Sequence, residues 1–320
     1  MALGAVVEAF DILGLGVTAI DDLLFVPAYP PPDSKVHVRR VVRQCGGLTA
    51  TALVAAARLG ARCAFAGILG DDDLSRYVLR RLEEEGIDTA HVCRRPCARP
   101  VHSVIVVDEL HKTRTIFADA AGAGLDEPLW PAEDVLRSAR VLFVDHVGVE
   151  RMIYGSRIAR GAGLPVVADL ENDEHPRFAE LLALVDHLIV SRAFARKLTG
   201  QDDPASAARR LGTEGRQAVV VTCGAEGCWY LGAGGKAPRH QPAFPVEVVD
   251  TTGCGDVFHG AYAAALAQGV ALPDRVRFAA AAAALKATQP GGQAGIPTRP
   301  IVEAFLAGDR DLRSRTSGRA

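Results

Sequence analysis

The stretch 247-EVVDTTGCGDVFHG-260 lies between a strand-like run and the helical run 261-AYAAALAQG-269. Glycine lowers helix stability, so Gly253 and Gly255 at a helix start call for another explanation. The first turn of a helix presents free N–H groups and the positive end of the helix dipole, and glycines let an anion approach that backbone closely. We therefore predict an anion-binding site at these glycines, with Asp256 in the first helical turn beside it.

Asp256 has a chemical interpretation and a structural one. A carboxylate at this position can accept a proton from an attacking hydroxyl group while the N–H groups hold the phosphate under attack. In the alternative interpretation, Asp256 only favours a helix N-terminus and the glycines only form a turn. Other motifs of the sequence are needed to choose between these two interpretations.

Composition restricts the class of protein. The chain has 320 residues, of which 49% are hydrophobic and 23% charged, which is typical of a soluble globular protein. The formal net charge of -2 gives no basic surplus for nucleic acid. No apolar run reaches the roughly 18 residues that span a bilayer. We expect small-molecule partners, with neither nucleic acid nor membrane.

Cysteine usage and the start of the chain favour the cytoplasm. The seven cysteines form no C-x-x-C pair and no spacing typical of a zinc site or a disulfide scaffold. The opening residues, MALGAVVEAFDILGLG, contain acids and lack the basic segment and cleavage site of a signal peptide. We therefore predict a cytoplasmic protein.

Short apolar runs alternate with helical stretches along most of the chain, which predicts an α/β domain with a parallel sheet covered on both faces. The segments at about 22–45 and 97–121 break this rhythm and resemble two strand-turn-strand ribbons. Inserted ribbons on an α/β body suggest a small β lid over a site. We treat residues 1–320 as one domain and expect the tail 308–320 to be mobile.

The segment DTTGCGDVFHGAY resembles the signature of the ribokinase-like (PfkB) carbohydrate kinases. In that family, the aspartate of D-T-T-G-x-G-D is the catalytic base and the T-G-x-G segment is the anion hole. Further stretches resemble family motifs in the family's order and cover nearly the whole chain, at 46–60, 67–88, 219–231 and 287–297. The resemblance implies a ribokinase-like three-layer α/β/α body with a mostly parallel central sheet and a small β-sheet lid.

The resemblance also implies roles for particular residues. The implied catalytic set is Asp256 as base with the backbone of Gly253, Cys254 and Gly255 as anion hole. The implied sugar-binding set is Asp21, the glycine pair Gly46 and Gly47, and Thr51, which stands where many members have an asparagine. The implied nucleotide-binding set is Thr222, Gly224, Gly227, Thr252 and Gly292.

The implied cofactors are ATP and Mg²⁺, and the resemblance leaves open whether a monovalent cation such as K⁺ takes part. Many members carry an N-x-x-E motif that helps to organise Mg²⁺, but this chain has Ser191 and Phe194 there. The nearest acids that could replace it are Asp169 and Glu171, at the end of a predicted strand. Alternatively, this acidic loop is simply solvated and the nucleotide's own phosphates carry the Mg²⁺ ion.

The resulting prediction is an ATP-dependent sugar kinase that phosphorylates a primary hydroxyl of a small ketose or related sugar. The C-terminal third is most similar to the branch that contains sulfofructose kinase, but the stretch 115-TIFADAAGAGLDE-127 is small and apolar. Because His146 and Arg151 are the only donors expected nearby, a neutral sugar is favoured over a sulfonated one.

Other functions remain open on the sequence alone. They are a sulfofructose or nucleoside kinase of the same fold, a non-catalytic sugar or nucleotide sensor, and a nicotinamide oxidoreductase suggested only by 14-GLGVTA-19. In the resembled family, the lids of two subunits often pair edge to edge. A homodimer through the lid is therefore a further expectation.

Overall fold

A central sheet of eight strands forms the body of the protein in the computed structural model, which describes residues 9–111, 113–123, 129–213 and 215–308. Its strand order is β14-β13-β12-β11-β10-β9-β1-β4, and all strands from β4 to β12 in this order run parallel. Antiparallel β13 and β14 complete one edge. The strands are β1 (Phe10–Leu15), β4 (Cys63–Phe65), β9 (Ala139–Val144), β10 (Val166–Asp169), β11 (His187–Ser191), β12 (Ala218–Thr222), β13 (Cys228–Gly232) and β14 (Arg239–Gln241).

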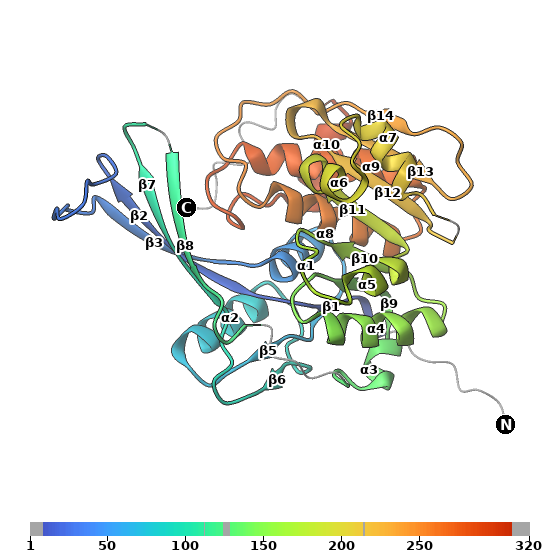
Figure 1. The fold of residues 1–320 in the computed structure, drawn as a ribbon, viewed down its shortest axis with the longest axis horizontal. Helices are drawn as coiled ribbons and strands as arrows, with labels where there is room; N and C mark the ends of the chain where they lie inside the picture. The colour runs from blue at the N-terminus through green and yellow to red at the C-terminus, as the bar shows by residue number, and fades with distance from the viewer. Residues whose placement is uncertain (1–8, 112, 124–128, 214, 309–320) are drawn as a thin grey trace.

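Helices cover both faces of this sheet, which confirms the predicted three-layer body (Figure 1). Successive residues of a strand point to opposite faces, so Val141 and Phe143 of β9 join one apolar cluster while Leu142 and Val144 join the other. The first cluster includes α1 (Leu48–Arg58), α2 (Asp73–Glu84), α8 (Cys254–Ala267), α9 (Leu272–Ala287) and α10 (Arg299–Leu306). The second includes α3 (Glu133–Arg137), α4 (Val149–Gly161), α5 (Phe178–Leu184), α6 (Arg192–Thr199) and α7 (Pro204–Leu211).

A second sheet of four strands projects from the body (Figure 1). It is built from two antiparallel hairpins, and we call it the lid. The first hairpin is β2 (Ala19–Val26) with β3 (Arg40–Gly46), and the second is β7 (Val101–Asp108) with β8 (Thr113–Asp119). Strands β2 and β7 join them in parallel, with Asp21 opposite Ser103. A short pair, β5 (Ile68–Leu69) with β6 (Cys93–Arg94), lies at the base of this region.

The direction of strand addition reverses beside β1, because β4 and β9 lie on its two sides. Ligands of open α/β sheets bind outside the carboxyl ends of the strands at such a switch point. The loop Gly16–Thr18 follows β1 there, and Asp145 follows β9. This edge of the sheet is also where the lid leaves the body.

Two sequence predictions concern the ends and the surroundings of the chain. The predicted mobile tail, 308–320, lies outside the described residues except for Gly308. Within the described ranges, none of the helices combines the length and the apolar character needed to cross a bilayer.

Candidate active site

The glycines of the opening stretch lie at the start of α8. Gly253 is the N-cap residue and has a left-handed backbone with φ 75°. A Cβ atom at this position would lie 2.8 Å from the carbonyl oxygen of Gly292, so the glycine is needed both for its conformation and for close backbone packing. The N–H group of Cys254 contacts the carbonyl of Thr251 at 3.2 Å. Helix geometry leaves the N–H groups of Gly255 and Asp256 without intrahelical acceptors, as an anion hole requires.

Asp256 lies in the first turn of α8, half-buried, at the centre of a group of acids. Burial raises the pKa of Asp256 well above its ordinary value. The negative charges of Asp169, Glu171 and Asp21 raise the same pKa further. The positive charge of Lys286 opposes them. Asp256 is therefore a stronger base, once ionised, than an aspartate in water.

Cys254 is half-buried beside this group. Burial raises the pKa of its thiol, although the charge of Lys286 acts in the opposite direction. The thiol is consequently held in its protonated form, which is the unreactive one. This supports a role for the Cys254 backbone and not for its sulfur.

The acids predicted to assist a metal ion have different surroundings. Asp169 ends β10, is 3% exposed, and lies 3.2 Å from Nδ1 of His259. Burial raises its pKa to about 6. His259 also contacts the carbonyls of Gly255 (2.8 Å) and Ile189 (3.0 Å), so it connects the first turn of α8 to the sheet. Glu171 is exposed in the loop after β10.

These surroundings bear on how Mg²⁺ could be held. Over the described residues, no three His, Cys, Asp or Glu side chains converge as a metal site. Mg²⁺ binds readily through one or two carboxylates together with substrate phosphates. The donors present fit an ion carried mainly by the nucleotide, with Asp169 and Glu171 close enough to Asp256 to share its electrostatic environment.

Among the residues predicted to bind sugar, Asp21 on β2 lies diagonally across from Gly46 on β3, whose register partner is Ala19. A Cβ atom on Gly46 would lie 2.8 Å from a carboxylate oxygen of Asp21, so only glycine leaves this carboxylate in place. Gly47 has φ 95°, and a Cβ there would lie 2.7 Å from the backbone of Thr18. Burial raises the pKa of Asp21, while a hydrogen bond from Ser103 lowers it.

Thr51 differs from the other predicted sugar-side residues. It lies in α1, is 1% exposed, and its hydroxyl accepts a hydrogen bond of 3.1 Å from the side-chain amide of Gln293. The hydroxyl thus connects α1 to the loop that carries Gly292. Its proposed contact with a sugar stays a prediction.

The predicted nucleotide-binding residues fall on three loops. Thr222 ends β12, and Gly224 opens the 3-10 turn Gly224–Glu226 that follows. A Cβ on Gly227 would lie 2.1 Å from the carbonyl of Gln241, so a glycine there allows the chain to turn into β13. Thr252 and Gly292 lie on the two loops that meet at the start of α8. Their contacts with a nucleotide stay predictions.

Two lid residues reach these loops. Nη1 of Arg114, on β8, donates a hydrogen bond of 3.0 Å to the hydroxyl of Thr252. The backbone N–H of Gly292 donates to the side-chain carbonyl of Gln44, on β3, at 3.3 Å. The lid therefore contacts the body beside the predicted anion hole. Neither residue is recognisable from the sequence, because neither belongs to a motif.

Asp145 is another residue that the sequence analysis missed. It is fully buried after β9 and accepts hydrogen bonds from the N–H groups of Val17 (2.7 Å) and Val147 (2.8 Å) and from the hydroxyl of Thr49 (2.8 Å). It therefore joins the loop after β1, the start of α1 and the loop after β9. Its position directly after a buried strand was the only signal in the sequence.

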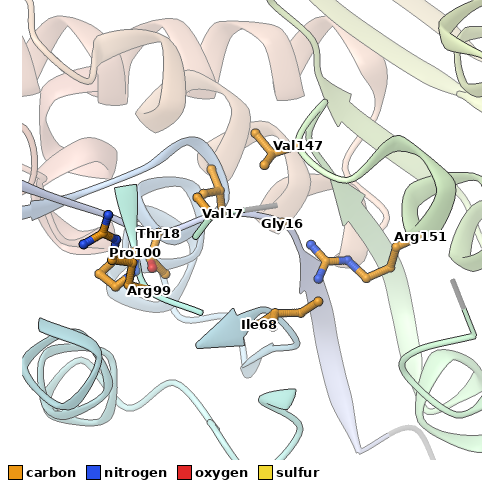
Figure 2. Close-up of a pocket in the computed structure, with 9 residues that line it drawn as sticks. Gly16, Val17, Thr18, Ile68, Arg99, Pro100, Val147 and Arg151 are labelled. Carbon is orange, nitrogen blue, oxygen red and sulfur yellow. The ribbon is translucent and has the colours of Figure 1, made fainter. Parts of the chain in front are cut away.

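A cavity of about 10 Å³, with room for about one water molecule, lies at the loop Gly16–Thr18 that follows β1 (Figure 2). Arg151 points into it from α4 and is 2% exposed, and Arg99 lies across from it. Arg99 forms an ion pair of 2.8 Å with Asp119. The buried hydroxyl of Thr18, also at this cavity, has no hydrogen-bond partner among the described residues.

Comparison with known proteins agrees with this arrangement. The model of the pfkB family of carbohydrate kinases matches residues 11–299. The chain is 29% identical to a ribokinase of Haemophilus influenzae over 91% of this chain and 97% of that protein. It is 28% identical to an aminoimidazole riboside kinase of Salmonella typhimurium over 82% and 88%.

A solved structure shows the same likeness in three dimensions. The structure of Arabidopsis thaliana ribokinase complexed with ribose and ATP superposes with a TM-score of 0.83. It shares 25% sequence identity and covers 93% of this chain and 99% of that one. The family match extends from β1 into α10 and includes both the loop before α8 and the lid. The chain belongs to the PfkB family of carbohydrate kinases, phosphotransferases with an alcohol group as acceptor.

Proposed function

We propose that this protein transfers the γ-phosphoryl group of ATP to a primary hydroxyl of a small neutral sugar, a ketose or a related compound. The observation that carries the proposal is the position of Asp256, whose carboxylate lies in the same helical turn as the open N–H groups of α8. The ribokinase complexed with ribose and ATP supports a sugar and a nucleotide as the two substrates.

Asp256 accepts the proton of the sugar hydroxyl as the O–H bond breaks. The sugar oxygen forms a bond to the γ-phosphorus while the bond from that phosphorus to the bridging oxygen breaks and ADP leaves. N–H groups at the start of α8 stabilise the charge on the transferring group. ATP, when bound with Mg²⁺, supplies the phosphoryl group and the neutralising charge. Asp169 and Glu171 would contribute to holding Mg²⁺ through water.

An ADP-release screen tests this function. Purified protein with ATP and Mg²⁺ is assayed against pentoses, hexoses, ketose phosphates, sulfofructose and nucleosides. We expect a neutral sugar to give the highest kcat/KM. Absence of ADP release with every acceptor would contradict the proposed activity.

The side-by-side comparison with sulfofructose decides the charge of the acceptor. A preference for sulfofructose of about 100-fold, or about 2.7 kcal/mol of differential transition-state binding, would overturn the neutral-sugar proposal. Arg151 and Arg99 at the cavity would then be the first residues to replace. Arg39 is a weaker candidate because it is exposed on the lid and paired with Glu109.

We also infer that the protein works in the reducing cytoplasm. No disulfide joins any of the seven cysteines, all of which lie in the described residues, and four of them are buried. Buried cysteines that form no disulfide suit a compartment in which disulfides do not form.

A homodimer through the lid is the proposed assembly. Every residue of β8 is exposed, and β8 is one edge of the lid sheet. Ile116 and Phe117, on its two faces, are 52% and 54% exposed. An exposed edge strand with apolar side chains favours pairing with another strand, here from a second copy of the chain.

We expect light scattering after size-exclusion chromatography to give the mass of a dimer. Phe117→Asp should shift the protein to a monomer, because the carboxylate would be buried at the contact. Glu303→Ala, on α10 away from the lid, serves as the control and should leave the mass unchanged. A wild-type monomer at micromolar concentrations would contradict the proposed assembly.

A further inference from the structure

Lys286 is a buried cation that the proposed mechanism does not use. It lies near the end of α9, in the sequence FAAAAAALKA, and its side chain is 0% exposed. Lysine is almost never fully buried without a partner. Burial lowers the pKa of Lys286, as expected for an ammonium group removed from water. A lysine on the exposed face of the same helix would avoid this cost, so its inward position requires a compensating interaction.

That interaction is with the loop before α8. Nζ of Lys286 donates a hydrogen bond of 3.0 Å to the backbone carbonyl of Asp250. The carboxylate of Asp250 accepts hydrogen bonds from the N–H groups of Thr252 and Gly291, each at 2.8 Å. Lys286 therefore holds the backbone of the residue that joins the two loops at the anion hole.

The end of α9 holds the same loop through its backbone. The N–H groups of Val249 and Asp250 both donate to the carbonyl of Ala287, at 2.8 and 3.1 Å. The last turn of α9 thus holds the loop through two contacts, the side chain of Lys286 and the carbonyl of Ala287. The ammonium group adds a positive charge to this attachment.

The charge of Lys286 also reaches the reacting region. Its electrostatic neighbours are Asp250, Cys254 and Asp256, while Arg114 from the lid is the cation that faces it. A fixed positive charge behind a helix N-terminus strengthens the potential that an anionic group meets there. The charge costs no reorganisation during the reaction, because the protein already holds it in place.

We propose that Lys286 is a positioning residue for phosphoryl transfer, in which the buried ammonium acts as a built-in cation for the anion-hole loop. It holds the turn from Asp250 to Gly253 in its binding conformation and adds positive potential behind α8. This inference rests on the proposed kinase activity. We therefore expect that activity does not require an external monovalent cation such as K⁺, because the ammonium group already supplies a positive charge at this loop.

The test compares two variants with wild type. Lys286→Met keeps the length of the side chain and removes its charge, and we expect kcat to fall about 10- to 100-fold with the sugar KM changed less than about threefold. Lys286→Ala leaves a space beside the Asp250 carbonyl. Ammonium or potassium chloride at about 0.1 M should raise the activity of Lys286→Ala about tenfold or more, because either ion is small enough to enter that space. Tetramethylammonium chloride at equal ionic strength should not.

Arg275→Met is the matched control. Arg275 is a buried cation of the same helix, but Nη1 donates to the hydroxyl of Tyr262 at 3.1 Å, away from the anion hole. The kcat of Arg275→Met should stay near that of wild type and should not respond to ammonium, even where the Tm of the variant falls. A purely structural role for Lys286 would make the two variants behave alike.

Three outcomes would overturn the inference about Lys286. They are a folded Lys286→Met variant with kcat within threefold of wild type, a folded Lys286→Ala variant that ammonium does not restore, and wild-type activity that falls tenfold or more without K⁺. The last measurement needs no variant, so it decides the matter even where the variants do not fold. Wild type that phosphorylates no acceptor would instead remove the proposed function itself.

Discussion

Replacing Asp256 by asparagine is expected to lower kcat by about 10²-fold or more while ATP still binds. Asparagine keeps the shape of the side chain but cannot accept the proton of the sugar hydroxyl, and general-base catalysis contributes factors of about 10² to 10⁴. The proposed anion hole consists of backbone N–H groups, which the substitution leaves in place. Steady-state ADP release gives kcat, and calorimetric titration with an unreactive ATP analogue gives the nucleotide Kd.

Asp203→Asn provides the control for this change. Asp203 is also an aspartate at a helix start, but it caps α7, a different helix from the one that begins at Gly253, by accepting a hydrogen bond from the N–H of Ser206. The kcat of the Asp203→Asn variant should match that of wild type. An Asp256→Asn variant with near wild-type turnover would remove Asp256 as the base.

The same substitution should raise stability, increasingly so at higher pH. Because the pKa of Asp256 is raised in the folded state, the unfolded chain ionises first as the pH rises above about 4. Wild type therefore loses stability relative to Asp256→Asn between that pH and the raised folded pKa, and the difference is then constant. Thermal melts from pH 4 to pH 8 measure it. A difference in Tm that is independent of pH would show that the carboxylate is not destabilised by its surroundings.

Replacing Asp21 by alanine is expected to raise the sugar KM roughly 10- to 100-fold with little change in the ATP KM. A hydrogen bond to a charged group contributes about 1.5–3 kcal/mol, and tenfold in KM corresponds to about 1.4 kcal/mol. Asp21 lies against Gly46 at the base of the lid, on the side proposed for the sugar. Initial rates with each substrate varied in turn separate the two KM values.

Asp22→Ala is a control from the neighbouring position. Successive residues of a strand point to opposite faces, and Asp22 forms hydrogen bonds with Arg43 (2.7 and 2.8 Å) and His102 (2.8 Å). Those hydrogen bonds, from Arg43 above all, lower its pKa to about 2. The Asp22→Ala substitution should leave the KM values for sugar and for ATP near those of wild type. Equal damage to the two KM values in Asp21→Ala would place Asp21 outside the sugar site.

Much of the body could be predicted from the sequence because its signals are local. The alternation of apolar strands with helical stretches indicates a parallel sheet, and the glycines ahead of Asp256 indicate a helix start, which the structure has at α8. Ser191 shows the limit of motif matching. The chain lacks an N-x-x-E motif there, and the Ser191 side chain instead accepts a hydrogen bond from the N–H of Phe194 as the N-cap of α6.

The rest depends on contacts between distant segments. The parallel pairing of β2 with β7 joins residues about 80 positions apart, and no local pattern specifies it. Asp145 and Lys286 likewise contact loops far from them in sequence. A single acid or lysine in an apolar run does not indicate such a contact, so their roles could not be predicted. Arg114 reaches Thr252 because the fold brings β8 beside the loop before α8.

The pairing of β2 with β7 sets a rule for engineering this protein. The two strands face each other from Ala19 opposite Val101 to Val26 opposite Asp108, so each hairpin of the lid supplies half of one sheet. A single hairpin transplanted from a relative would meet side chains along the entire β2–β7 seam that it was not selected to pack against. A graft intended to change the acceptor therefore has to exchange residues 19–46 and 101–119 together, as one cassette in two pieces.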